Sequence, residues 1–328
     1  MKQINLSRYC TATSGAKRRA GAAGPPGATV PAHNAGLDSG GALAIVKRAS
    51  AGIVVVALAG VAGIATYVQE SNRRALDHRY PVASEPVQAA SDGAAVARGK
   101  RLADVTGCTD CHGPDLRGKL FSDEGWLHGR YYASNLALKA QGYSDEDIAR
   151  IVRRGVRPDG RGVIAMPAMG FVRVTDREIA DILAFVRSLP AGGQVQPDHY
   201  LGPLDQWELW RGGNVKPAIS YVAAERAKEP ADAGPEHAGA RHLAGIVCAE
   251  CHGGDLKGNG WDTGAPDLGV VRSYGLAEFT RLLRTGIGAD GKEHGLMTEI
   301  ARGRLYHLTD EEIAALHAYL LARAQLRS

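Results

Sequence analysis

The feature that most limits how this chain can fold is a five-residue motif that occurs twice. Two cysteines separated by two residues are followed at once by a histidine, as CTDCH at 108–112 and CAECH at 248–252. Residues at positions i, i+3 and i+4 share one face of a helical turn, so both thiols and the imidazole point the same way. This pattern is typical of c-type haem attachment, in which two thioethers bind the haem vinyl groups and the histidine binds the iron.

The motif therefore predicts two covalently attached haem c groups. The predicted attachment residues are Cys108, Cys111, Cys248 and Cys251, and the predicted axial histidines are His112 and His252. A zinc ribbon fits less well, because its second cysteine pair follows the first by about 15–20 residues, whereas these pairs are 140 residues apart. A thioredoxin-like site requires a βαβ setting, which the sequence does not indicate.

The motif belongs to a longer internal repeat. Three blocks recur in the same order, pairing CHGPDLRGK with CHGGDLKGN, RIVRRGVRPDGR with RLLRTGIGADGK, and TDREIADILAF with TDEEIAALHAY. Such self-similarity indicates a duplicated domain. We assign the two domains to residues 94–190 and 237–328, joined by a linker at 191–236 that has no counterpart in either copy.

Both copies are predicted to be helical. Thr175 and Thr309 each precede a glutamate by three residues, which is the capping-box pattern at the start of a helix. Gly155 and Gly286 end two further runs of helical periodicity, and another helix is expected just before the first motif. No stretch alternates clearly as a strand, so the fold class is predicted to be all-α.

A membrane segment is predicted ahead of the repeat. Residues 49–68 carry no charge, and a helix of that length spans about 30 Å, the thickness of a bilayer core. Basic residues precede this stretch, so the N-terminus is expected in the cytoplasm and the remainder outside it. We assign 1–48 to a disordered cytoplasmic segment, 49–68 to a transmembrane anchor and 69–93 to a tether. A cleaved signal peptide is the alternative for this stretch.

The charge distribution argues against nucleic acid as a partner. Residues 1–50 contain seven Lys or Arg and one Asp, although the whole chain has a net charge of only +4. The rest of the chain is therefore slightly acidic, whereas nucleic-acid-binding domains carry a basic surface.

The repeat also suggests the sixth iron ligands. Met166 follows Gly160 by six residues, and Met297 follows Gly291 by six residues. A methionine near a helix is ordinarily core filler, but equivalent placement in both copies favours a ligand role. Met166 and Met297 are therefore predicted to bind the two irons.

Three other residues compete for the sixth position. Met169 is an alternative in the first copy, although it aligns with Ile300 in the second. His128 and His294 are rival ligands at non-equivalent positions, for which an exposed surface histidine is the simpler explanation.

Together these features resemble a di-haem c-type cytochrome with two tandem class I-like domains behind a membrane anchor. The similarity covers about residues 43–328, and Met166-Pro167 resembles the usual sixth-ligand motif of that family, whereas Thr298 after Met297 departs from it. The resemblance implies a one-electron carrier on the periplasmic side of the bacterial inner membrane. It also implies redox partners such as a dehydrogenase, a quinol-oxidising complex, a soluble cytochrome or a terminal oxidase.

Two other functions are compatible with two such motifs. A di-haem peroxidase requires one iron that is open to peroxide, and the symmetrical methionines argue against this enzyme. The electron-accepting cytochrome subunit of a dehydrogenase complex agrees with an electron-carrier role, because the chain has no dehydrogenase domain of its own.

Overall fold

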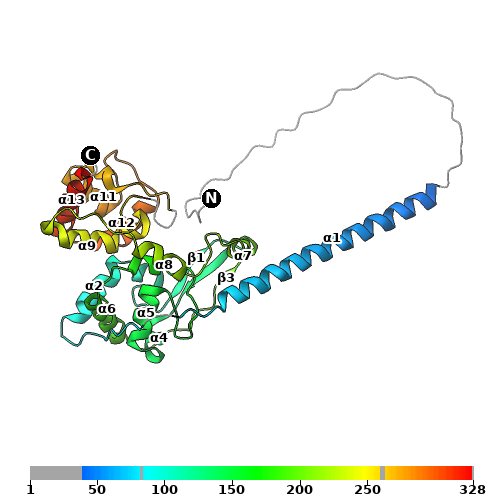
Figure 1. The fold of residues 1–328 in the computed structure, drawn as a ribbon, viewed down its shortest axis with the longest axis horizontal. Coiled ribbons are helices and arrows are strands. Elements are labelled where there is room, and N and C mark those ends of the chain that lie inside the picture. Colours follow the sequence, from blue (N-terminus) through cyan, green and yellow to red (C-terminus); the bar gives the residue numbers. More distant parts are fainter. Residues whose placement is uncertain (1–38, 82–83, 259–262, 327–328) are drawn as a thin grey trace, which may run out of the picture. The chain divides into compact units, whose positions relative to one another are not determined.

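A computed structural model describes residues 39–81, 84–258 and 263–326. These residues fall into two units, residues 39–69 and residues 70–326 (Figure 1). Residues 1–38, which make up most of the predicted disordered segment, lie outside the described residues.

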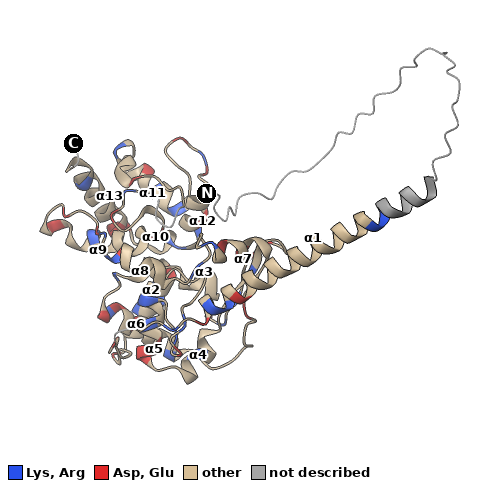
Figure 2. Cartoon of the chain, turned by 45° about the vertical axis from the view of Figure 1, so that its right-hand side comes forward, with Lys and Arg blue, Asp and Glu red and all other residues tan. Residues whose placement is uncertain are grey.

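The first long helix, α1 (Ser39–Leu76), contains the predicted membrane segment. Its part from Lys47 to Leu76 is long and apolar enough to cross a membrane. Apolar side chains are exposed along it, with Ile53 and Val56 at 70% and 73%, and Figure 2 shows no charge along its middle. The helix continues to Leu76, so the start of the predicted tether is helical.

The larger unit is mostly helical, and its elements follow the repeat. The first copy contains α2 (Ala95–Val105), α3 (Cys108–His112), β1 (Lys119–Asp123), β2 (Gly129–Ala133), α4 (Leu136–Gly142), α5 (Asp145–Arg154), the 3-10 helix η1 (Ala168–Phe171) and α6 (Asp176–Ser188). The connecting segment contains β3 (Tyr200–Leu201), α7 (Pro203–Trp210) and α8 (Ile219–Arg226). The 3-10 helix η2 (Pro235–His237) leads from the linker into the second copy. The second copy contains α9 (Ala238–Val247), α10 (Ala249–His252), η4 (Leu268–Ser273), α11 (Leu276–Thr285), α12 (Leu296–Gly303), η5 (Leu305–His307) and α13 (Asp310–Gln325).

The predicted helix ends are confirmed. The side chains of Thr175 and Thr309 accept the backbone N–H of the glutamate three residues later, and both capping boxes are complete. Gly155 and Gly286 end α5 and α11 in the left-handed conformation, with φ of 68° and 75°. Glycine adopts this conformation without steric cost, which explains why the chain stops both helices there.

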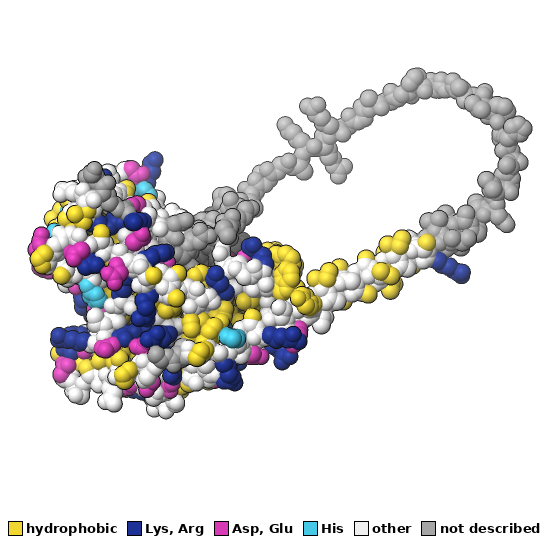
Figure 3. All heavy atoms as spheres, in the orientation of Figure 1, with side chains coloured by type: hydrophobic (Ala, Val, Ile, Leu, Met, Phe, Trp, Pro, Cys, Tyr) yellow, Lys and Arg dark blue, Asp and Glu magenta, His cyan; other side chains and the backbone are white. Residues whose placement is uncertain are grey.

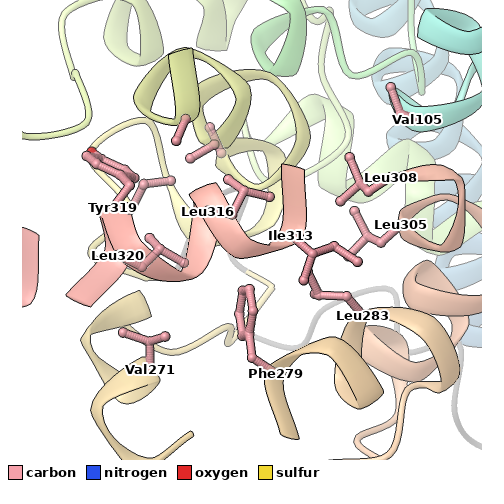
Figure 4. Close-up of a cluster of buried hydrophobic side chains, with 14 residues drawn as sticks. Val105, Val271, Phe279, Leu283, Leu305, Leu308, Ile313, Leu316, Tyr319 and Leu320 are labelled. Atoms are coloured by element: carbon pink, nitrogen blue, oxygen red, sulfur yellow. The ribbon is translucent and has the colours of Figure 1, made fainter. Parts of the chain in front are cut away.

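The cores lie on the apolar faces of the last helix of each copy. Figure 4 shows Ile313 of α13 facing Phe279 and Leu283 of α11 within a cluster of buried side chains. The same cluster includes Val105, which comes from α2 of the first copy. The corresponding face of α6 is buried in its own cluster through Ile179, Ile182, Leu183 and Val186.

The expectation that no strand would form is wrong at one place, which comprises part of the first copy and part of the linker. The strands β1, β2 and β3 form an antiparallel sheet in that order, with a register shift between Leu120 and Ser122. Burial does alternate along β2, but Gly129 and Ala133 occupy two of its buried positions. Small residues at buried positions give no hydrophobic alternation, which is why the sequence pattern did not indicate the strand.

The predicted tether, from residue 70 on, and the linker belong to the larger unit. The buried carboxylate of Glu85, in the predicted tether, forms ion pairs with Arg153 and Arg154 of α5. In the linker, the rings of Trp207 and Trp210 lie 4.8 Å apart on α7. Hydrophobic side chains are visible at the surface beside α7 in Figure 3.

Candidate functional site

Each Cys-x-x-Cys-His motif forms a short helical turn directly after a longer helix. The first motif is α3, which follows α2, and most of the second motif is α10, which follows α9. Both turns end at a glycine with similar dihedral angles, φ 84° and ψ 161° at Gly113 and φ 80° and ψ 153° at Gly253. This region of backbone space is accessible essentially to glycine alone, so the glycine after each histidine determines how the chain leaves the motif.

The two motif histidines are oriented in the same way. Nδ1 of His112 lies 2.8 Å from the carbonyl oxygen of Ser134, and Nδ1 of His252 lies 2.8 Å from that of Pro266. A carbonyl oxygen only accepts, so Nδ1 must carry the proton and Nε2 keeps its lone pair. Burial lowers the pKa of both imidazoles, which favours the neutral form that binds metals.

The four motif cysteines are half-buried and are not paired in disulfides. Burial raises the pKa of Cys111 to about 11 and the pKa values of Cys248 and Cys251 to about 12. Before a haem is attached, these thiols are therefore held in the protonated form. No group of three or more His, Cys, Asp or Glu is arranged to hold a metal ion within the residues that the structure describes.

The turns ahead of the two predicted methionine ligands have the same structure. A β-bridge joins Val156 to Gly162 in the first copy, and another joins Ile287 to Glu293 in the second. Within these turns, Gly160 and Gly291 have φ of 84° and 74°. Met166 packs against the core that also contacts Cys108, and Met297 packs against the core that contacts Cys248.

The backbone at the two methionines differs. Met166 lies in an irregular segment after Ala165, which has a φ of 64°. Met297 lies instead in the first turn of α12. Each methionine therefore follows its turn glycine by six residues in both copies, but the backbone conformation at the methionine differs between them.

The rival ligands lie in other settings. Met169 is in η1 and is 4% exposed. The side chains of His128 and His294 are 46% and 43% exposed, and their imidazoles contact Asp205 and Asp290 at 3.3 Å and 3.1 Å. These histidines are surface residues with carboxylate partners.

The sequence reasoning missed a second set of matched residues that support the histidines. The carbonyl oxygens of His112 and His252 accept the N–H groups of Gly118 and Gly258 at 2.8 Å and 2.7 Å. Between the histidine and the glycine of each loop, the chain contains a buried leucine with a positive φ. These residues are Leu116, with φ 54°, and its counterpart Leu256, with φ 60°. These leucines and glycines occupy the same positions in the first repeated block, and this match could have identified them from the sequence.

A sequence profile described as Cytochrome c matches residues 96–190 and 236–324, which together make up more than half of the chain. The chain belongs to the cytochrome c family. Two family domains, each containing one motif, indicate a di-haem c-type cytochrome that carries two covalently bound haem c groups and transfers electrons.

Three relatives agree with this family. The diheme cytochrome c-type of Cereibacter sphaeroides is 24% identical over 315 residues, which cover 84% of this chain and 97% of that protein. The fructose dehydrogenase cytochrome subunit of Gluconobacter japonicus is 25% identical over 72% of this chain. The alcohol dehydrogenase (quinone) cytochrome c subunit of Gluconobacter oxydans is 25% identical over 70% of this chain. The match spans about half the length of the two dehydrogenase subunits, 54% and 55%.

The residues present in each motif fit a covalently bound haem. Each turn offers two thiols for thioether bonds and an imidazole whose Nε2 is available to iron, since a backbone carbonyl accepts from Nδ1. A carbonyl that fixes the tautomer and ring direction of a metal-binding histidine is a common supporting contact.

Proposed function

We propose that the two haems are held by the residues that the repeat predicts. Cys108 and Cys111 attach one haem, and Cys248 and Cys251 attach the other. His112 and His252 bind the irons through Nε2, and Met166 and Met297 are the sixth ligands. The observation that carries this proposal is the matched hydrogen bond from each imidazole Nδ1 to a backbone carbonyl at 2.8 Å.

When bound, each haem supplies an iron that cycles between the ferric and ferrous states. The chain determines how readily this occurs. Ser134 and Pro266 hold the imidazoles in one tautomer, and a methionine thioether favours the ferrous state and raises the reduction potential. Histidine and methionine together leave no open coordination position, which suits electron transfer and not peroxide chemistry.

The proposed role is a relay between an electron-donating complex and a terminal acceptor. Two relatives are named as cytochrome subunits of dehydrogenases, one of them quinone-linked. We therefore favour a dehydrogenase or a quinol-oxidising complex as the donor, and a soluble cytochrome or terminal oxidase as the acceptor.

The proposed location is the periplasmic face of the bacterial inner membrane. Helix α1 would anchor the chain, because it is long and apolar enough to cross a bilayer. An anchored carrier stays close to membrane partners, which raises its effective concentration there.

The proposal is tested by removing the attachment residues of one motif at a time. Cys108→Ala with Cys111→Ala should leave one haem per chain by intact mass, and so should Cys248→Ala with Cys251→Ala. Cys10→Ser is the matched control and should keep both haems. Retention of two haems in either double variant would overturn the assignment.

The same preparations distinguish a carrier from a peroxidase. The wild type should show low-spin spectra for both haems and no turnover of hydrogen peroxide. A high-spin haem together with peroxide turnover would favour a di-haem peroxidase and contradict the relay.

A further inference from the structure

One arginine contacts both motif helices. Arg304 directly follows α12, and its side chain is 13% exposed. Its Nε donates to Oδ2 of Asp110 in α3 at 2.6 Å, and its Nη1 donates to Oε2 of Glu250 in α10 at 2.8 Å. Asp110 and Glu250 occupy the same motif position, immediately before the second cysteine. A single guanidinium therefore binds the equivalent carboxylate of both motifs.

The surroundings of this guanidinium are closely packed. A Cβ at Gly107, the residue before Cys108, would lie 2.2 Å from Cζ of Arg304. Beside it, Leu305 shares a buried cluster with Val105 of α2 (Figure 4). Arg304 thus lies against the backbone that leads into the first motif, and an apolar contact between the two copies supports it.

The first copy has a glycine where the second copy has Arg304, so one arginine serves the carboxylates of both motifs. Arg304 precedes Thr309 by five residues, and the residue five before Thr175 is Gly170. A Cβ at Gly170 would lie 3.3 Å from Cβ of Glu250. The glycine in the first copy therefore leaves space for Glu250 to reach the arginine of the second copy.

This contact contains more negative than positive charge. Two carboxylates share one guanidinium, and the side chains of Asp110 and Glu250 are only 30% and 15% exposed. Removing the arginine would leave two partly buried negative charges within the motifs without this counter-charge. Interactions between charges are strong where water is excluded, so this loss should reach both haem sites.

We propose that Arg304 is a positioning residue that holds the two Cys-x-x-Cys-His turns against each other and raises the reduction potentials of both haems. This inference rests on the proposed attachment of one haem at each motif. The cation disfavours the additional positive charge of ferric iron, and the carboxylates on either side fix the cation between the two sites.

The test is a redox titration of the full-length, haem-loaded protein. Arg304→Gln should move both midpoint potentials to lower values, and Arg304→Lys, which keeps the charge, should restore most of that shift. Arg101→Gln is the matched control, because Arg101 also forms an ion pair between the two copies, with Glu312, which lies outside both motifs. It should leave both midpoints unchanged.

Three results would overturn the proposal: one midpoint or none moves in Arg304→Gln, lysine restores nothing, or Arg101→Gln lowers both midpoints equally. If Arg304→Gln does not fold, Asp110→Asn and Glu250→Gln replace it. Each removes one negative charge and should raise a midpoint, and unchanged midpoints in both would overturn the proposal. A haem count below two per wild-type chain would instead contradict the proposed function.

Discussion

Gly99 of α2 faces the backbone carbonyl of Asp181 in α6, and a Cβ at Gly99 would lie 1.8 Å from that oxygen. The contact brings the two helices together closely, and the buried carboxylate of Asp181 also accepts from Arg98 at 2.7 Å. Glycine in a helix interior costs about 0.5–1 kcal/mol relative to alanine. The close approach of α2 and α6 explains why glycine occurs here.

Gly99→Ala should therefore destabilise the first domain by about 1–3 kcal/mol, as other overpacking substitutions do. Denaturant unfolding of the haem-loaded protein measures the loss. The matched control is Gly239→Ala, which also lies nine residues before the first cysteine of its motif and has no atom within 4 Å of an added Cβ. The control should be neutral or slightly stabilising, and an equal loss in both variants would contradict the explanation.

Met166→Ala and Met297→Ala should each affect one haem. Each variant should lose the optical signature of ferric iron–methionine bonding at one haem, and one of the two midpoint potentials should fall, because the thioether favours ferrous iron. A redox titration with optical detection measures both effects.

Met169→Ala is the control for the first copy. It should keep both midpoints and lower the stability by about 2–5 kcal/mol, the usual cost of truncating a buried methionine. If Met169→Ala lowers a midpoint and Met166→Ala does not, the alignment of the repeats is wrong at this ligand.

The features predicted best from the sequence are those that depend on residues close together in the chain. Thr175 and Thr309 mark their helix starts through residues only three positions away, and both boxes form. Strand β2 was not predicted, because the small residues Gly129 and Ala133 occupy two of its buried positions. Arg304 also gave no sequence signal, since its partner Asp110 is 194 residues away and only tertiary packing brings them together.

Helix α1 should keep the protein in the membrane. Its exposed apolar side chains have no favourable contact with water, so washing membranes at alkaline pH should not release the chain. Protease added to spheroplasts should digest the haem domains. Release by the wash, with an N-terminus at about residue 66, would show a cleaved signal peptide instead.

His242 of α9 and Glu178 of α6 should make the stability of the larger unit depend on pH. Nε2 of His242 lies 2.9 Å and 3.1 Å from the two carboxylate oxygens. The hydrogen bond to Glu178 raises the pKa of His242. Burial opposes ionisation of Glu178, but the hydrogen bond from His242 lowers the pKa of Glu178 overall.

Because the folded pKa of His242 lies above its unfolded value of about 6.5, the contribution of this pair is present below that value. It is lost as the pH rises through the folded pKa of His242. At the acid end it is lost as the pH falls through the lowered pKa of Glu178.

His242→Gln should therefore reduce the free energy of unfolding at about pH 6 but not at about pH 9. Because the imidazole is about one-third exposed, the effect should be small, about 0.2–1 kcal/mol. Denaturant titrations of wild type and variant at both pH values measure it, and only the difference between the two proteins is compared, since the other histidines titrate equally in both. An equal loss at the two pH values would mean that His242 contributes through packing and not through its charge.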